Sequence, residues 1–92
     1  MSHKPYSVLN QELTEAAKGQ IKIGGKYYHW KDPNFIYEVI GLGFLEWSGE
    51  IAVTYKPVDE NVVWIRRLNG KDGWLTSVER EGEDKRRFIP AE

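Results

Sequence analysis

The fold is decided by residues 24–40, which read Gly24-Gly25-Lys26-Tyr27-Tyr28-His29-Trp30-Lys31-Asp32-Pro33-Asn34-Phe35-Ile36-Tyr37-Glu38-Val39-Ile40. Aromatic and β-branched residues favour the pleated surface of a strand, and Asp-Pro-Asn is a sequence that reverses the chain. The stretch therefore predicts a β-hairpin that is opened by a glycine pair and turned at residues 32–34. We expect this hairpin to start a small barrel or sandwich.

Outside the hairpin, short apolar segments alternate with turn residues. The second hairpin strand is expected from Phe35 to about Leu45, and its glycines at 41 and 43 predict a bulge or bend of the kind a small barrel needs. Further strands are expected at residues 51–56, 62–68 and 85–90, which gives five short strands. Residues 74–78 can form one helical turn, and residues 79–84 are predicted to be a charged loop.

Residues 7–19 have a different periodicity. Apolar side chains recur at the spacing of one helical face, at Leu9, Leu13, Ala16 and Ala17. Ser7 can cap the start of a helix, and Gly19 is a good end signal. The sequence therefore predicts one amphipathic helix lying on the barrel, preceded by a frayed polar tail at residues 1–6.

Composition limits the possible functions. The chain has 92 residues, enough for one domain, and a net charge of −1, which gives no general attraction to nucleic acid or to a membrane. It has no cysteine, and no apolar run approaches the ~20 residues of a membrane span. These features are typical of a soluble cytoplasmic protein.

A set of motifs occurs in a fixed order along the chain: Gly25-Lys26-Tyr27-x-His29-Trp30-Lys31, Tyr37-Glu38-Val39-Ile40-Gly41, Val53-x-Tyr55, Trp64-Ile65-Arg66 and Arg87-Phe88. This order resembles the short bacterial family catalogued as domain of unknown function 1653. The resemblance runs from Gly25 to about Ile89 and implies a compact SH3-like barrel, with no activity attached to it. Arg67 stands where the family usually has proline, and residues 69–73 look like an insertion.

The expected fold class is therefore mainly β, a small five-stranded SH3-like barrel with one N-terminal α-helix. The tail and the helix occupy residues 1–19, outside the family pattern, and the barrel occupies residues 20–92 of a single domain.

Alternation along the first hairpin strand places Tyr27, His29 and Lys31 on one face. A face that carries an aromatic ring, an imidazole and an ammonium is costly to bury, so we expect it to be solvated or to be a binding site. With Arg66 or Arg87 beside it, such a face would suit an anionic or aromatic ligand. Two alternatives remain open. Tyr27 and His29 can instead bond backbone groups of a bent hairpin, and the arginines can pair with the acidic residues that surround them in sequence.

The tryptophans are expected to differ in burial. Trp64 and Trp74 are predicted to lie in the core, because large side chains fill the interior of a small barrel. The same core is expected to contain Val39, Ile40 or Leu42, Val53, and Ile65 or Val63. Trp47 falls in the predicted turn at residues 46–50, where burial is hard to arrange. It is therefore a candidate for stacking on a base, a sugar or a proline.

The sequence favours binding over catalysis. No P-loop, nucleophile elbow or His-Glu-x-x-His motif is present, and two histidines without cysteine make a metal site improbable, so no metal or cofactor is expected. The predicted function is a non-catalytic module that binds a protein or peptide. Nucleic-acid or nucleotide binding through aromatic and Arg/Lys side chains is the alternative, and an enzyme centred on His29 is a third interpretation. No membrane partner is expected, and the sequence does not determine the oligomeric state.

Overall fold

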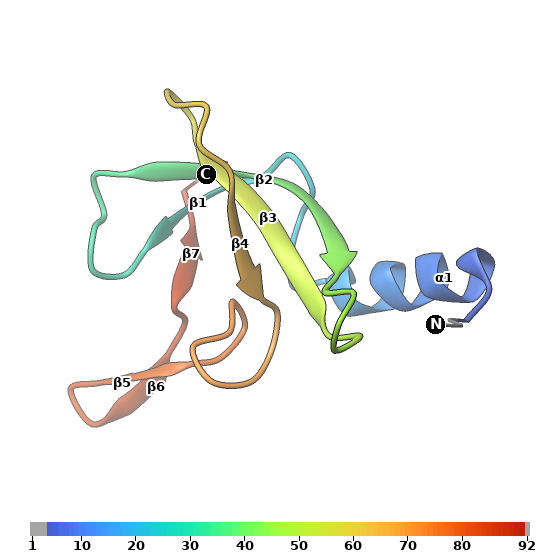
Figure 1. Ribbon diagram of the computed structural model, residues 1–92. Helices are drawn as coiled ribbons and strands as arrows, with labels where there is room; N and C mark the ends of the chain where they lie inside the picture. Colours follow the sequence, from blue (N-terminus) through green and yellow to red (C-terminus); the bar gives the residue numbers. More distant parts are fainter. Residues whose placement is uncertain (1–3, 92) are drawn as a thin grey trace.

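The structure, a computed structural model, describes residues 4–91, so residues 1–3 of the tail expected at residues 1–6 lie outside the described residues. Tyr6, also expected in that tail, belongs to the N-terminal helix instead. The elements in chain order are α1 (Tyr6–Ala17), β1 (Lys26–His29), β2 (Ile36–Phe44), β3 (Ile51–Pro57), β4 (Trp64–Arg67), β5 (Val78–Arg80), β6 (Glu83–Lys85) and β7 (Phe88–Pro90). Figure 1 shows the strands β1–β4 and β7 at the centre of the molecule, with α1 at one end and the β5–β6 hairpin projecting from the other.

The main sheet contains the five strands that the sequence predicts. Its order is β4-β3-β2-β1-β7, and every neighbouring pair is antiparallel. The prediction of a mainly β fold with one N-terminal helix is thus confirmed. The two edge strands, β4 and β7, are not hydrogen-bonded to each other in this order, so closure into an SH3-like barrel stays a prediction. The sheet nevertheless curls, as a contact between its two edge strands shows. The guanidinium of Arg66 in β4 lies 5.2 Å from the ring of Phe88 in β7.

The charged segment at residues 79–84 is not the loop that the sequence predicts. It belongs to the antiparallel hairpin of β5 and β6, which pairs Val78 with Lys85 and Arg80 with Glu83. Glu81 and Gly82 at its tip both have positive φ, of 55° and 80°. Positive φ at both central residues is typical of the two-residue turn whose twist matches that of the flanking strands.

The expected final strand at residues 85–90 is divided for the same reason. β6 ends at Lys85 and β7 begins at Phe88, so residues 86 and 87 carry the chain from the small sheet to the large one. Residues 73–76 form a single hydrogen-bonded turn, in which the Thr76 amide donates to the Gly73 carbonyl at 3.1 Å. No helix occurs between residues 20 and 90.

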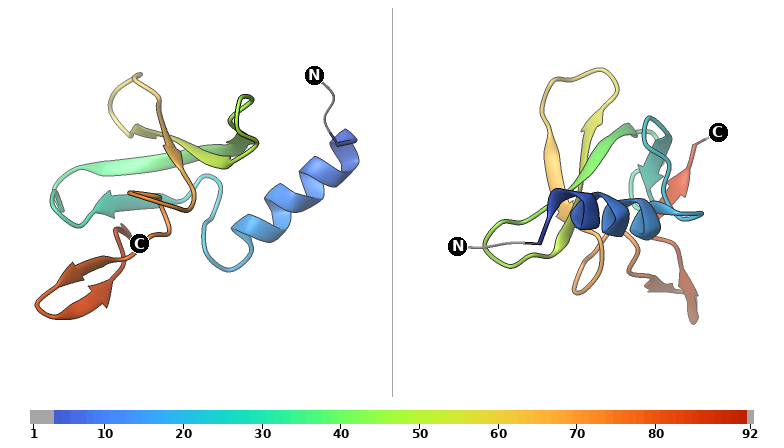
Figure 2. Two further views of the ribbon diagram at one scale, coloured as in Figure 1. Left: turned by 60° about the horizontal axis from the view of Figure 1, so that its bottom comes forward. Right: turned by 90° about the vertical axis from the view of Figure 1, so that its right-hand side faces the viewer.

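α1 agrees with the helix predicted at residues 7–19, with ends shifted by one or two residues. Pro5 rather than Ser7 precedes its first turn, and the Pro5 carbonyl accepts the amides of Val8 and Leu9 at 3.0 and 3.1 Å. Gly19, with φ of 70°, follows the end of the helix, as expected. Two further views show α1 standing at the rim of the sheet rather than across its face (Figure 2). None of its residues is buried.

The bulge predicted from the glycines of β2 is present. The register between β2 and β3 shifts between Val39 and Gly41, so that Val39 faces Tyr55 while Gly41 faces Thr54. The Thr54 hydroxyl donates to the Gly41 carbonyl at 3.0 Å across this irregularity. A bulge bends a strand and increases its twist, which fits the curl of the sheet.

The core lies on the concave side of the sheet and includes residues from most of its strands: Ile21, Tyr27, Val39, Val53, Tyr55, Leu68, Trp74 and Phe88. Val39, Val53 and Trp74 were predicted to be there. The prediction for Trp64 is wrong, because 53% of Trp64 is exposed whereas 2% of Trp74 is exposed. Trp64 lies in the edge strand β4 beyond the cover of neighbouring elements. The segment after β4 folds back and inserts Trp74 instead.

This difference between the two tryptophans gives a stability prediction. Trp74→Ala should lower the free energy of unfolding by about 3–5 kcal/mol, because it empties a large buried volume. Trp64→Ala should change it by less than about 0.5 kcal/mol, as for most exposed positions. Urea denaturation of both variants at low protein concentration is the measurement. Equal losses for the two would contradict this assignment of the core.

Gly73 has to be a glycine for a steric reason. A Cβ placed there would lie 2.6 Å from the Asn69 carbonyl carbon, which is backbone and cannot rotate away. Gly73→Ala should therefore destabilise the protein by about 1–3 kcal/mol. Gly43→Ala in β2 is the matched control, since a Cβ at Gly43 meets nothing within 4 Å. Thermal unfolding should separate the two variants, and a Gly73→Ala protein as stable as the control would overturn this reading of the turn.

Candidate anion-binding site

Tyr27 and His29 share one face of β1. The sequence led us to expect this face to be solvated or to be a binding site, but at Tyr27 it is buried. Only 5% of Tyr27 is exposed, and its ring packs edge-on against Trp74 with centroids 5.5 Å apart. Its hydroxyl accepts the backbone amide of Lys22 at 3.0 Å. Tyr27 thus satisfies a backbone group inside the bent hairpin, which was the structural alternative for this residue.

His29 lies at the end of β1, half-buried between two aromatic rings. The ring of Phe88 meets it edge-on at 5.1 Å, and the ring of Trp30 lies 6.0 Å away and nearly parallel. The imidazole Nδ1 accepts the backbone amide of Lys31 at 3.2 Å. Because Nδ1 is the acceptor, the neutral ring carries its proton on Nε2, which leaves one N–H donor for a ligand.

Arg66 belongs to the edge strand β4, and Arg87 directly precedes the other edge strand, β7. The two arginines are linked through Asp72. The Nη1 of Arg66 donates to the Asp72 backbone carbonyl at 2.7 Å, and the Nη2 of Arg87 lies 3.7 Å from the Asp72 carboxylate. The Nε of Arg66 donates to the Tyr55 hydroxyl at 3.5 Å, and the Nε of Arg87 donates to the Thr76 carbonyl at 3.3 Å. Each guanidinium is therefore fixed by neighbours and still keeps N–H groups that have no acceptor among the described residues.

These side chains form one cluster, which we call the Arg66–Arg87 site. His29, Tyr55 and Arg66 lie around the ring of Phe88. Tyr37 adjoins Tyr55, and Arg87 is linked to Arg66 through Asp72. The ring of Tyr55 lies 5.7 Å from Phe88 and 5.4 Å from the ring of Tyr37. The sequence had indicated His29, Arg66 and Arg87 for this face, and the fold brings all three together. It had missed Tyr37, Tyr55 and the bridging Asp72, although Tyr37 and Tyr55 both stand in the recurring motifs.

The electrostatics of the cluster keep its titratable rings neutral. Burial lowers the pKa of His29 below its ordinary 6.5, and the charges of Arg66, Arg87 and Lys31 lower it further, against a smaller opposing effect of Asp32. Burial raises the pKa of Tyr37 above 10.0, with Tyr55 and Asp32 adding to the rise and Arg66 opposing it. The site therefore offers a protonated phenol and a neutral imidazole beside fixed positive charges.

Such an arrangement can bind an anion. Guanidinium groups present parallel N–H donors that match the two oxygens of a carboxylate or a phosphate. Partial burial strengthens the attraction because the local dielectric is lower than in water. Within residues 4–91 no group of three or more His, Asp or Glu side chains could hold a metal ion.

Lys31 and Trp47, the remaining predicted ligand residues, stand apart from this cluster. Lys31 is exposed, and its ammonium lies 5.4 Å from the ring of Trp30, close enough for its charge to act on His29. Trp47 is exposed as predicted, at 78%, but it lies in the turn after β2, at the opposite end of that strand from Tyr37. Any ligand of Trp47 would therefore be separate from one held by Arg66.

Trp30 anchors the β5–β6 hairpin. The guanidinium of Arg80 lies 5.0 Å from its ring, and the Trp30 amide donates to the Arg87 carbonyl at 3.0 Å. The indole Nε1 of Trp30 and the Nε of Arg80 are buried without a protein acceptor among the described residues. The hairpin is thus attached to the main sheet mainly by a cation–π contact.

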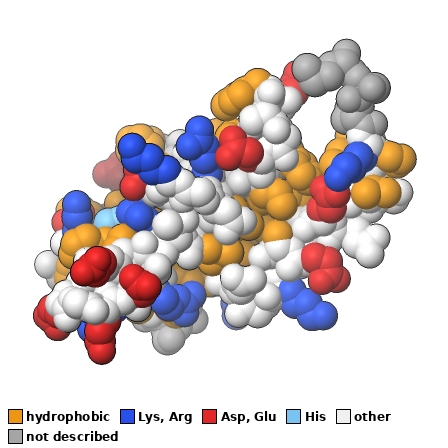
Figure 3. Space-filling model, turned by 90° about the horizontal axis from the view of Figure 1, so that it is seen from below, with side chains coloured by type: hydrophobic (Ala, Val, Ile, Leu, Met, Phe, Trp, Pro, Cys, Tyr) orange, Lys and Arg blue, Asp and Glu red, His pale blue; other side chains and the backbone are white. Residues whose placement is uncertain are grey.

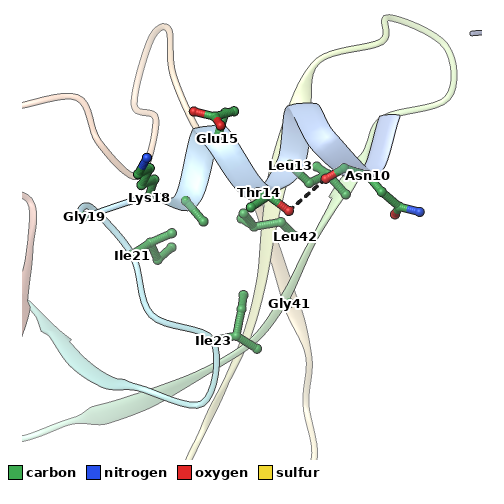
Figure 4. Close-up of a pocket in the computed structure, with 11 residues that line it drawn as sticks. Asn10, Leu13, Thr14, Glu15, Lys18, Gly19, Ile21, Ile23, Gly41 and Leu42 are labelled. Atoms are coloured by element: carbon green, nitrogen blue, oxygen red, sulfur yellow. Dashed lines mark hydrogen bonds between the residues drawn. The ribbon is translucent and has the colours of Figure 1, made fainter. Parts of the chain in front are cut away.

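A groove lies on the other side of the molecule, between α1 and β2 (Figure 4). Its walls are mostly aliphatic, from Leu13, Ile21, Ile23 and Leu42, and the Thr14 hydroxyl at its rim donates to the Asn10 carbonyl at 3.0 Å. Its lining contains neither an arginine nor an aromatic ring. Figure 3 shows acidic and basic side chains mixed over the face that it draws, with hydrophobic side chains between them. The charge needed for an anion is thus concentrated locally, at the Arg66–Arg87 site.

The fold and the site together define a small, mainly β protein with one cationic cluster over an aromatic ring. Residues 25–90 match the family described as "Protein of unknown function (DUF1653)", and the chain belongs to this family. The resemblance in the sequence is thereby confirmed, and the matched range contains every residue of the Arg66–Arg87 site. Comparison with curated proteins and with solved structures gave no match. No helix in residues 4–91 has both the length and the apolar character needed to cross a membrane.

The lowered pKa of His29 predicts a pH dependence of stability. A base whose pKa is lower in the folded state than its ordinary 6.5 favours folding above pH 6.5, and this contribution is lost as the pH falls through the lowered value. The stability advantage of the wild type over His29→Asn should therefore shrink between pH 7 and pH 5. Urea denaturation of both proteins across this pH range measures the difference in their free energies of unfolding. The titration of the acidic residues is common to both proteins and cancels in that difference. Parallel curves for the two proteins would contradict the assigned neutral state of His29.

Proposed function

We propose that the protein is a small binding module that recognises a partner protein or peptide through an acidic group held at the Arg66–Arg87 site. One observation carries the proposal: two arginines from opposite edges of the sheet converge on Asp72, and one of them, Arg66, also lies over the ring of Phe88. Asp72 is the only carboxylate paired to either arginine within residues 4–91. Since 13% of the Arg87 side chain is exposed, its charge is only partly screened by water.

The geometry supports a carboxylate as the group bound. The free N–H groups of Arg66 and Arg87 would supply the main donors, with His29 Nε2–H and the Tyr37 hydroxyl as neutral donors beside them. The Asp72 carboxylate is 69% exposed and 3.7 Å from Arg87, a loose pair that an incoming carboxylate could displace. A peptide would lie along the open side of the sheet between β4 and β7. This fits the further proposal that the sheet is an SH3-like barrel.

Nucleic-acid or nucleotide binding is the second candidate, and one observation favours it. Trp64 is half-exposed two residues before Arg66 and therefore on the same face of β4, where a base could stack on it. Asp72 pairs with Arg87 and Asp32 acts on the pKa of His29, however, and the net charge of the chain is −1. Binding to a phosphate backbone depends on a basic surface, so the peptide is the better candidate.

A peptide selection on the full chain tests the proposal. Peptides taken from a random library should contain Asp or Glu, or need a free C-terminal carboxylate. Their amide shift perturbations should centre on His29, Tyr37 and the residues around Arg66 and Arg87. Arg66→Lys keeps the charge but loses the planar pair of donors, so it should weaken binding by about 10-fold. Arg80→Lys, on the outlying hairpin, is the matched control and should bind as wild type.

Two readouts separate the proposal from its competitors. A bound anion should raise the pKa of His29, measured by NMR, because it offsets the two arginines that lower it. Peptide affinity should correspondingly increase as the pH falls below 6.5 toward 5. Selected peptides without an acidic group would sink the proposal, as would shifts confined to the turn around Trp47. Binding of oligo-dT that weakens steeply with salt would favour nucleic acid instead.

A further inference from the structure

The residues around β4 form an exposed apolar run that the Arg66–Arg87 site does not use. Consecutive side chains from Val62 to Ile65 are each at least half-exposed, with 53% for Val62, 50% for Val63, 53% for Trp64 and 64% for Ile65. Ile65 or Val63 was predicted to lie in the core, and that prediction is wrong, because nothing within residues 4–91 covers this run. Contiguous apolar surface of this kind is typical of an interaction site.

The backbone beside these side chains is also unpaired on its outer side. The Leu68 amide donates to the Ile51 carbonyl at 2.9 Å, and the pairing of β3 with β4 has no register shift. Since successive residues of a strand direct their amides to opposite sides, the amide and carbonyl of Ile65 point away from β3. The Arg67 carbonyl, on the same outer side, is taken by the Trp74 amide at 2.7 Å. The free edge therefore ends at Ile65.

The segment before β4 extends this edge. No backbone hydrogen bond within residues 4–91 involves Asn61, Val62 or Val63. Natural proteins protect open edges with lysine, proline or a bulge, and residues 61–65 contain none of these. A chain that adds a strand here would satisfy free backbone groups and cover apolar side chains in one step.

The run is flanked by opposite charges, so it is complementary in charge to a second copy of itself that lies antiparallel to it. Asp59 and Glu60 precede it, and Arg66 and Arg67 follow it. Two copies in antiparallel pairing place the acidic end of one against the basic end of the other. If Val63 faces Val63 of the second copy, Ile65 faces Asn61, and Arg67 lies toward the turn that carries Asp59 of the second copy. Residues that direct their amides outward then face each other, as exchange of hydrogen bonds requires.

We propose that this protein forms a two-fold symmetric dimer by antiparallel pairing of the edge at residues 61–65, and that the flanking charges select a second copy of this chain. A closed two-fold pair is also the commonest symmetry for soluble homo-oligomers. The dimer covers Trp64 and Ile65 and leaves the second side of the sheet, at β7, free. The dimer can be tested separately from the proposed ligand site through Asp59 and Arg67, because the Arg67 side chain is on the opposite face of β4 from Arg66.

A charge exchange on the full chain tests the dimer. Arg67→Glu puts acid against acid, and Asp59→Lys puts base against base. Each alone should raise the dissociation constant of the dimer by about 10-fold or more, measured by sedimentation equilibrium. An equimolar mixture of the two variants should restore a dimer, which native mass spectrometry identifies as the heterodimer. Arg86→Glu, an exposed charge reversal away from the edge, should leave the dimer unchanged.

Hydrogen exchange gives a second, residue-specific measurement. Raising the concentration of the wild type should slow exchange at the amides of Val63 and Ile65. A wild-type chain that stays monomeric into the high micromolar range overturns the proposal, and pairing with a different chain then becomes the candidate. The proposal is also overturned if both charge variants dimerise as well as the wild type, or if an equimolar mixture of the two variants does not restore the dimer. Circular dichroism of each variant shows that any loss of the dimer is not a loss of the fold.

Discussion

Trp74 and Phe88 lie face to face, with ring centroids 3.7 Å apart and planes within 2° of each other. This contact joins the segment after β4 to the strand β7, at opposite edges of a sheet that no hydrogen bond closes among the described strands. Tyr55 packs edge-on against both rings and Tyr27 against Trp74. The contact between Trp74 and Phe88 thus holds the sheet in its curled form. The four aromatic rings together are the largest side chains of a small core.

The candidate site is a consequence of that contact. Since Phe88 is held in place by Trp74, its other neighbours, His29 and Arg66, meet at fixed distances from one ring. The turn that delivers Trp74 also delivers Asp72, which bridges Arg66 and Arg87. Positive charge is therefore concentrated at one place in a chain that is nearly neutral as a whole. Burial, with these positive charges adding to it, lowers the pKa of His29 and keeps the imidazole neutral, and the charges would attract an anion.

The two adjacent arginines of β4 show how one strand can serve two surfaces. Arg66 points to the concave side, where it contacts Tyr55 and Phe88, while Arg67 points to the other side and pairs with Glu50 at 3.5 Å. The outer edge of the strand is divided in a similar way. The amides of Trp74 and Leu75 cover its end by bonding the carbonyls of Arg67 and Leu68, and its beginning is left open. A ligand on the concave side and a second copy at the edge would thus use different atoms of the same few residues.

The sequence by itself determined the hairpin, the five main strands, the bulge near Gly41 and the helix, because period-two and helical spacings and turn residues act locally. It also indicated His29, Arg66 and Arg87, whose alternation places them on defined faces. Only the tertiary structure decided that Trp74 is buried and Trp64 exposed. Burial depends on which distant segment folds over a position. The loop after β4 returns to the concave side with Trp74, whereas no segment within residues 4–91 returns to the edge. The same long-range packing placed Tyr27 in the core and brought Asp72 between the two arginines. Neither outcome has a signal in local spacing, since each depends on residues that meet only when the sheet curls.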